Sequence, residues 1–194
     1  SRLELPLEEV TLAEMLKGAG YVSASIGKWH LGNQGFLAPD QGFAVSAAGD
    51  CAGSTNDFFY PAWKKKIPLE GAREGEYLTD RLTDLALDFV RKSAGRPFFL
   101  YAVHTPIQAK PEYIPRYEKK VRADDPQNYP TYAAMLQSVD ESVGRVLDLL
   151  DSLKLTGETI VVFTSDNGGV TSREWQGRPV TSNLPLRSGK GHLY

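Results

Sequence analysis

Apolar residues follow two different spacings along the chain. Some segments repeat an apolar residue every three or four positions, which is the spacing of one helical face. These segments predict helices at Val10–Ala19, Glu76–Ser93 and Tyr129–Leu153. Pro111, a favoured first residue of a helix, predicts a shorter helix at Pro111–Lys120. Other segments are short runs of apolar and β-branched residues, and they predict strands at Tyr21–Ile26, Phe98–Val103 and Thr159–Thr164.

Capping signals support the boundaries of the first two helices. Thr11 and Glu14 have the spacing of a capping box, in which each side chain accepts a hydrogen bond from a backbone N–H left unpaired at the helix start. Gly18 and Gly20 are stop signals for the first helix, and Gly95 is the stop signal for the second.

The strand segments are nearly continuous in apolar character, which is typical of strands covered on both faces. Helices that alternate with such strands predict an α/β fold with a mostly parallel central sheet and helices on both faces. Residues 33–76 interrupt this pattern, with frequent Gly, Pro, Asn and Asp and no sustained period. Their aromatic residues argue against disorder, so we interpret the segment as a long ordered excursion near a substrate cleft, with Asp50–Ser54 as loop.

The composition restricts the classes of function. A net charge of -2 gives no sign of the basic surface that nucleic-acid proteins carry, and Lys64–Lys66 is interpreted as solvated surface. No run approaches the ~18 apolar residues of a membrane span. Cys51 is the only cysteine, so no disulfide forms within the chain, and we interpret it as a loop thiol. The chain does not begin with Met, and we expect it to be a piece of a longer protein.

Polar side chains follow each predicted strand at its carboxyl end. Lys28 and His30 follow the first strand, His104 follows the second, and Asp166 and Asn167 follow the third. Ligands bind outside the carboxyl ends of strands in open α/β sheets, so parallel strands would bring these groups to one rim. A cation, two imidazoles, a carboxylate and an amide on one rim suit a metal ion and an anionic substrate.

Each of these residues also has a structural interpretation. Lys28 and His30 project to the same side only if the backbone there is extended; otherwise the lysine is solvated and the histidine binds a backbone carbonyl. His104 can be interpreted equally well as a histidine at the sheet edge that donates a hydrogen bond to a carbonyl at the strand end. Asp166 and Asn167 precede two glycines, which suits a plain turn as well as a metal loop.

The last segment offers a further cation. Lys190 lies between two glycines and can approach an anion without steric obstruction, although the spacing of a phosphate-binding P-loop is absent. Arg187 and His192 are interpreted as structural or supporting residues, and Trp29 as a packing residue.

Taken together, the chain resembles the type I sulfatases, which are formylglycine-dependent sulfate-ester hydrolases of the alkaline phosphatase superfamily, and it is most similar to arylsulfatase-type members. The motifs that carry the resemblance span nearly the whole chain and are, in order, Thr11–Lys17 with Ala19–Tyr21, Gly27–Gly32, Asp40–Phe43, Glu76–Asp80, Val103–Pro106, Thr164–Gly169 and Pro185–Gly191. The resemblance implies the α/β fold of that superfamily, with 1–194 as part of the catalytic domain.

The resemblance also implies a role for each site residue. Asp166 and Asn167 match positions that bind the active-site Ca²⁺, with Mg²⁺ as the less expected metal. Lys28 and Lys190 match lysines that hold the sulfate group. His104 matches the histidine near the leaving oxygen.

His30 matches the histidine beside the nucleophile, which helps to cleave the sulfated intermediate. The nucleophile itself, a formylglycine made from Cys or Ser in a Cys/Ser-x-Pro-x-Arg motif, has no counterpart in this chain, because Cys51 lacks the Pro and Arg that should follow it. We expect it upstream, together with an Asp pair that completes the metal site, and a C-terminal subdomain downstream. The 194 residues alone are therefore expected to be inactive and to bind Ca²⁺ poorly.

The expected function is hydrolysis of sulfate esters by the full-length parent, acting on a sulfated small molecule or glycan, with a periplasmic or extracellular location by resemblance. Hydrolysis of phosphate or phosphonate esters on the same fold is the alternative enzyme activity. A non-catalytic module that binds sulfated glycans is the alternative outside enzymes. The sequence leaves the substrate and the oligomeric state open.

Overall fold

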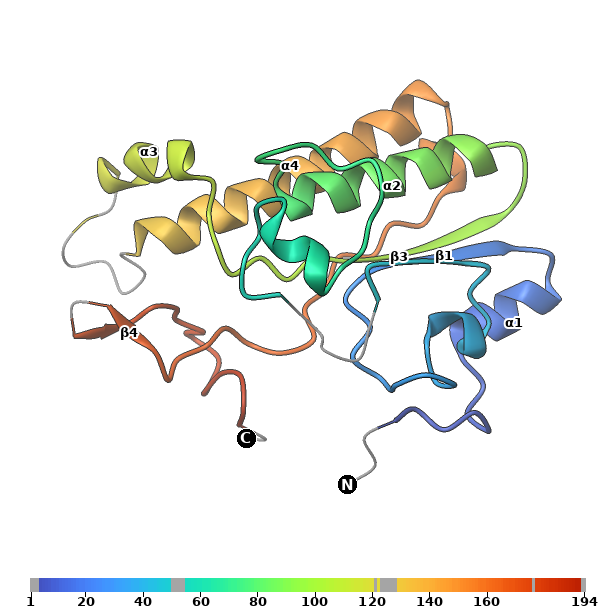
Figure 1. Cartoon of the computed structure of the whole chain (residues 1–194), viewed down its shortest axis with the longest axis horizontal. Helices are drawn as coiled ribbons and strands as arrows, with labels where there is room; N and C mark the ends of the chain where they lie inside the picture. The colour runs from blue at the N-terminus through green and yellow to red at the C-terminus, as the bar shows by residue number, and fades with distance from the viewer. Residues whose placement is uncertain (1–3, 50–54, 121, 123–128, 176, 193–194) are drawn as a thin grey trace. The chain divides into compact units, whose positions relative to one another are not determined.

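The computed structural model describes residues 4–49, 55–120, 122, 129–175 and 177–192 (Figure 1). The predicted loop at Asp50–Ser54, with Cys51, lies outside the described residues. The helices are α1 (Leu12–Gly18), α2 (Leu78–Ser93), α3 (Ile114–Glu118) and α4 (Pro130–Ser152), with 3-10 turns η1 (Ala38–Gln41), η2 (Ala62–Lys65), η3 (Pro111–Tyr113) and η4 (Thr156–Glu158). The strands are β1 (Val22–Gly27), β2 (Val45–Ala47), β3 (Phe98–Val103), β4 (Glu174–Trp175) and β5 (Arg178–Pro179).

The chain divides into two compact units. The first comprises Ser1–Ile107 and Val139–Gly157, and the second comprises Gln108–Ser138 and Glu158–Tyr194. The first unit contains the main sheet, and the second contains α3 and the antiparallel pair β4 and β5.

The sheet of the first unit is parallel, with strand order β2-β1-β3. β1 lies in the centre, and its partners in β3 run from Val22 opposite Phe98 to Gly27 opposite Val103. The predicted parallel arrangement of the first two strands is confirmed. β2 was not predicted, because its three residues, Val-Ser-Ala, carry no apolar run that distinguishes them from loop.

Helices cover both faces of this sheet (Figure 1). On one face, the buried positions of α2 pack with Leu150 of α4 against Ala24 and Ile26 of β1. On the other face, a smaller cluster joins Ala13 of α1 to Trp29, Ala38 and Phe43. The mostly parallel α/β fold with helices on both faces is thus confirmed for this unit.

The capping box at the start of α1 is present. The Glu14 N–H donates to Thr11 Oγ1 at 3.2 Å, and the Thr11 N–H donates to Glu14 Oε2 at 2.8 Å. The hydrogen bond from the Thr11 backbone lowers the pKa of the Glu14 carboxyl, and the Thr11 hydroxyl adds to this effect.

The prediction of a third strand at Thr159–Thr164 is wrong, because the structure has no strand there. The segment pairs with no other strand among the described residues, and its apolar side chains are exposed, including Ile160 at 92% and Phe163 at 77%. A strand is stabilised only when a neighbouring backbone supplies its ladder of hydrogen bonds, and the described residues place none beside this run.

The described part of residues 33–76 packs aromatic side chains into the main core. Trp63 is fully buried in the main core, and its Nε1–H donates to the Glu76 carbonyl at 3.3 Å. Phe58 is buried in the same core, and Phe59 pairs with Tyr77 in an isolated antiparallel bridge. The location of this segment near a substrate cleft stays a prediction. Across the described ranges, no helix combines the length and apolar character needed to cross a bilayer.

Candidate active site

The register of the sheet places two of the predicted site residues at the carboxyl ends of neighbouring strands. Gly27 ends β1 and Val103 ends β3, and their Cα atoms are register partners. Lys28 and His104 are the residues that follow them. The carboxyl ends of β1 and β3 therefore bring a lysine and a histidine to the same edge, as the sequence predicted.

Glycine is required at the end of β1. Gly27 has φ +103°, and a Cβ built on it would lie 2.0 Å from the Val103 carbonyl oxygen. Any other residue would push the two strand ends apart, because that contact is with backbone. The close approach of β1 and β3 at the site edge thus depends on this residue.

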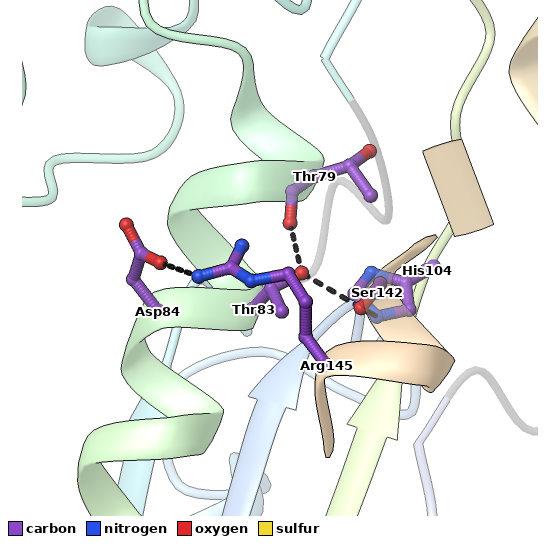
Figure 2. Close-up of polar contacts among 6 residues, drawn as sticks. All are labelled: Thr79, Thr83, Asp84, His104, Ser142 and Arg145. Carbon is purple, nitrogen blue, oxygen red and sulfur yellow. Dashed lines mark hydrogen bonds and ion pairs between the residues drawn. The ribbon is translucent and has the colours of Figure 1, made fainter. Parts of the chain in front are cut away.

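A chain of hydroxyl groups holds the His104 ring (Figure 2). His104 Nε2 lies 2.8 Å from Ser142 Oγ of α4, and Ser142 Oγ lies 2.7 Å from Thr83 Oγ1 of α2. Thr83 Oγ1 in turn lies 2.7 Å from the Thr79 carbonyl oxygen. The alternative interpretation, in which His104 satisfies a strand-end carbonyl, is replaced by a side-chain anchor from two helices.

The anchor is shielded from water. Thr79, Thr83 and Ser142 are buried, and burial lowers the pKa of the partly buried His104 below its usual value, because the charged imidazolium loses hydration. An ion pair between Arg145 and Asp84 links the same two helices nearer the surface (Figure 2). Burial thus favours the neutral form of the ring, and the hydrogen bond to Ser142 fixes its orientation.

The segment after β1 is not extended. His30 has φ +57°, so the condition under which Lys28 and His30 would project to the same side is not met. Trp29 lies between them and is buried, and its Nε1–H donates to the Phe36 carbonyl at 2.8 Å. Trp29 is a packing residue, as predicted, while Lys28 is half-buried and His30 is exposed.

The candidate metal loop belongs to the second unit. Asp166 and Asn167 are exposed, and the Ser165 hydroxyl donates to the Asn167 carbonyl at 2.7 Å. The Asn167 Nδ2 donates to the Gly168 carbonyl at 2.8 Å, which leaves the amide oxygen as the side-chain atom able to bind a cation. The loop thus presents a carboxylate and an amide oxygen on adjacent residues, and both are oxygen ligands suited to Ca²⁺.

Asn183 joins this metal loop to the loop that carries Lys190. Its Oδ1 accepts from the Gly169 N–H at 2.8 Å, and its Nδ2 donates to the carbonyls of Ser188 at 2.8 Å and Gly169 at 3.2 Å. The Lys190 N–H also donates to the Gly169 carbonyl, at 3.1 Å. The second unit therefore brings the Lys190 backbone next to the Asp166–Asn167 loop.

Glycine again permits close contact between these two loops. A Cβ on Gly189 would lie 2.2 Å from the Gly169 carbonyl oxygen. His192 lies one turn further, with its Nδ1 at 3.3 Å from the Gly189 carbonyl, which agrees with a structural role. Arg187 is exposed.

The predicted site residues therefore fall into two groups. Lys28, His30 and His104 belong to the first unit, and Asp166, Asn167 and Lys190 belong to the second. The convergence of both groups on one rim stays a prediction. The described residues contain no cluster of three or more His, Cys, Asp or Glu side chains able to hold a metal ion. Asp166 and Asn167 would supply only part of the roughly six to eight oxygen ligands of Ca²⁺.

Sequence reasoning missed the residues that hold the site side chains in place. Thr83, Ser142 and Asn183 are polar residues within apolar or loop segments, and none was singled out. A signal was present in α4, where the buried positions Ala134, Ser138 and Ser142 recur every four residues. Two serines on the buried stripe of a helix require polar partners, and that requirement points to a functional neighbour.

Comparisons with known proteins agree with these features. A sulfatase family profile matches residues 4–194. N-acetylgalactosamine-6-sulfatase of Sus scrofa is 32% identical over 213 aligned positions, and the alignment covers 96% of this chain and 37% of that protein. Arylsulfatase A of Homo sapiens is 32% identical over 225 aligned positions, and the alignment covers 100% of this chain and 42% of that protein.

The fold has solved counterparts as well. The crystal structure of Ps i-CgsB superposes with a TM-score of 0.75 at 29% identity, covering 98% of this chain and 46% of that one. The structure of Ps i-CgsB in complex with k-i-k-neocarrahexaose gives the same TM-score of 0.75. The chain spans less than half the length of each of these relatives. Because the family match extends over nearly all of its residues, the chain belongs to the sulfatase family.

Proposed function

We propose that the protein containing this chain hydrolyses sulfate esters. The observation that carries the proposal is the pairing of Gly27 with Val103, which sets Lys28 and the anchored His104 at one edge of the sheet. A lysine supplies positive charge for an anionic group, and a fixed imidazole supplies a proton carrier. These are the requirements for releasing an alcohol from a sulfate ester.

Each predicted residue has a role in this proposal. Lys28 and Lys190 hold the sulfate oxygens, and their charge opposes the negative charge that grows as the ester bond breaks. His104 delivers a proton to the leaving oxygen, and His30 lies beside the nucleophile. The formylglycine nucleophile itself is assigned to a part of the protein upstream of this chain.

Asp166 and Asn167 are proposed as Ca²⁺ ligands. The metal ion, when bound, would polarise the sulfate oxygens and stabilise their charge. Asn183 keeps the loop of these two ligands next to the loop of Lys190 through its bonds to Gly169 and Ser188. The remaining ligands are assigned to residues outside this chain.

The proposed substrate class is a sulfated sugar. Support comes from the relatives, since one is named N-acetylgalactosamine-6-sulfatase and one similar structure holds k-i-k-neocarrahexaose. The described part of residues 33–76 is proposed to lie near the substrate cleft. By resemblance to the sulfatase family, we propose a periplasmic or extracellular location for the protein.

The test is a comparison of sulfate and phosphate ester hydrolysis by the full-length protein. We expect turnover of an aryl sulfate and of a sulfated oligosaccharide, with a much lower rate for the matching aryl phosphate. Lys28→Ala should abolish most of the sulfatase activity, while Lys119→Ala, which removes an exposed lysine, should leave it unchanged. Faster hydrolysis of the phosphate ester would support the phosphatase alternative, and binding of the oligosaccharide without turnover would support a binding module.

A further inference from the structure

The hydroxyl chain behind His104 has a direction that follows from counting protons. Each hydroxyl has one proton to donate, while its oxygen accepts through lone pairs. Thr83 Oγ1 lies 2.7 Å from the Thr79 carbonyl oxygen, which can only accept, so the Thr83 proton is used there. The 2.7 Å contact between Thr83 and Ser142 then requires the Ser142 hydroxyl to donate to Thr83 Oγ1.

The same proton count determines which ring nitrogen of His104 carries the hydrogen. Since the Ser142 proton goes to Thr83, Ser142 Oγ can only accept in its 2.8 Å contact with His104 Nε2. His104 therefore donates from Nε2–H, and the neutral ring has its lone pair on Nδ1. The opposite direction would leave two oxygen lone pairs facing each other at the Thr83 and Thr79 contact. Figure 2 shows the four residues in this order.

The Nδ1 atom is in an unusual state. It is buried and has no hydrogen-bond partner among the described residues, although a buried imidazole nitrogen is normally paired. Burial also lowers the pKa of His104, and no ion pair contributes to that shift. Nε2 of the ring is thus hydrogen-bonded to Ser142, while Nδ1 has no hydrogen bond among the described residues.

We propose that Thr83 and Ser142 are positioning residues that hold His104 as the Nε2–H tautomer, so that Nδ1 is the atom that exchanges a proton with the substrate. This inference rests on the proposed sulfatase function. In the resting ring Nδ1 has no proton, and it takes one from water when the anionic substrate binds, because the negative charge of the sulfate favours the imidazolium. When the S–O ester bond breaks, the leaving oxygen takes that Nδ1 proton, and the ring returns to the neutral form that donates from Nε2–H to Ser142.

The first test measures the tautomer of His104 directly. In the full-length protein with ¹⁵N-labelled histidine, the His104 ring, assigned by comparison with His104→Gln, should show a protonated Nε2 and an unprotonated Nδ1 at neutral pH. A resting ring protonated at Nδ1 would overturn the proposal. This readout does not depend on catalysis, so it holds even if the protein proves to have another activity.

The second test separates positioning from packing. Thr83→Val keeps the side-chain shape but removes the acceptor for Ser142, which frees the Ser142 proton to donate to His104 Nε2. We expect a population protonated at Nδ1, a kcat lower by roughly tenfold on an aryl sulfate, and a smaller change in KM. Thr83→Ser restores the hydroxyl and should restore both the tautomer and kcat.

Ser138→Ala is the control, because Ser138 is buried on the same helix but bonds to the Ala134 carbonyl at 3.5 Å instead of the histidine. It should leave the His104 tautomer and kcat unchanged. If wild type hydrolyses aryl sulfates but a folded Thr83→Val variant keeps the wild-type tautomer and kcat, the positioning role fails while the proposed function stands. If wild type is inactive on sulfate esters and Nε2 is protonated, the proposed function fails and the hydrogen-bond assignment stands.

Discussion

Gly27 and Val103 are register partners at the ends of β1 and β3, and a Cβ at Gly27 would lie 2.0 Å from the Val103 carbonyl oxygen. This contact sets how closely the two strands approach where Lys28 and His104 follow them. The geometry of the site edge in the first unit is therefore fixed by the absence of a side chain at one position.

Gly27→Ala should destabilise the protein by roughly 3 kcal/mol or more, because alanine is strained at a φ of +103° and its Cβ would overlap a backbone carbonyl. Denaturant unfolding of the full-length protein measures this loss. Gly144→Ala is the matched control, since a Cβ there meets nothing within 4 Å inside α4. That change should raise stability by about 0.5–1 kcal/mol, and equal effects at the two positions would contradict the argument.

The stability of the protein should depend on pH through His104. Burial lowers its pKa below the usual 6.5, so the unfolded chain binds the proton more readily than the folded one. The full contribution is present above pH 6.5 and falls as pH decreases toward the folded-state pKa, by at most about 1.4 kcal/mol per pH unit. Unfolding free energies of wild type and His104→Gln measured between pH 5 and pH 8, at about half-unit steps, should show a smaller slope in the variant. Ser138→Ala, which removes no titratable group, should keep the wild-type slope.

Asn183→Asp should loosen the contact between the two loops of the second unit. The carboxylate keeps one acceptor but loses both donors, and it faces the carbonyl oxygens of Ser188 and Gly169. We expect a loss of about 1–3 kcal/mol in the local stability of these loops. Hydrogen exchange at the Lys190 amide, which donates to Gly169, reports the opening directly.

Asn33→Asp is the control for this charge change, because the Asn33 side chain is exposed and, within the part of the chain that the structure describes, Asn33 is bonded only through its backbone carbonyl, which accepts from the Phe36 N–H. Exchange at Lys190 should not change in this variant. Unchanged exchange in Asn183→Asp as well would show that Asn183 does not hold the loops together.

Asp166→Asn should weaken Ca²⁺ binding by the full-length protein at least tenfold, because it replaces a charged oxygen ligand with a neutral one. Calorimetric titration with Ca²⁺ measures the change apart from activity. Asp148→Asn, an exposed position on α4, is expected to bind Ca²⁺ as wild type does. Wild-type affinity in Asp166→Asn would remove this residue from the metal site.

Sequence predicted the elements that local signals determine. The capping box of Thr11 and Glu14, the helix ending at Ser93 and the strand Phe98–Val103 all depend on residues close together in the chain, and all are confirmed. The fold class followed from the alternation of these elements. The likeness of short motifs to a known family then led to the sulfatase assignment.

Sequence did not predict features that depend on distant partners. Thr159–Thr164 has the composition of a strand, but a strand forms only where another backbone lies beside it. Ser142 anchors His104 across 38 positions of sequence, and Asn183 bonds to Gly169 across 14. Such hydrogen bonds leave no local periodicity, so only the folded arrangement identifies the residues that make them.

The exposed run at 160–163 has a consequence for the behaviour of these residues in solution. Ile160, Val161, Val162 and Phe163 are uncharged, strongly β-prone and open to the solvent. Such a segment favours self-association through intermolecular β-pairing. At high concentration, the 194 residues by themselves are therefore expected to aggregate through this run, and a charged residue at Val162 should keep them monodisperse.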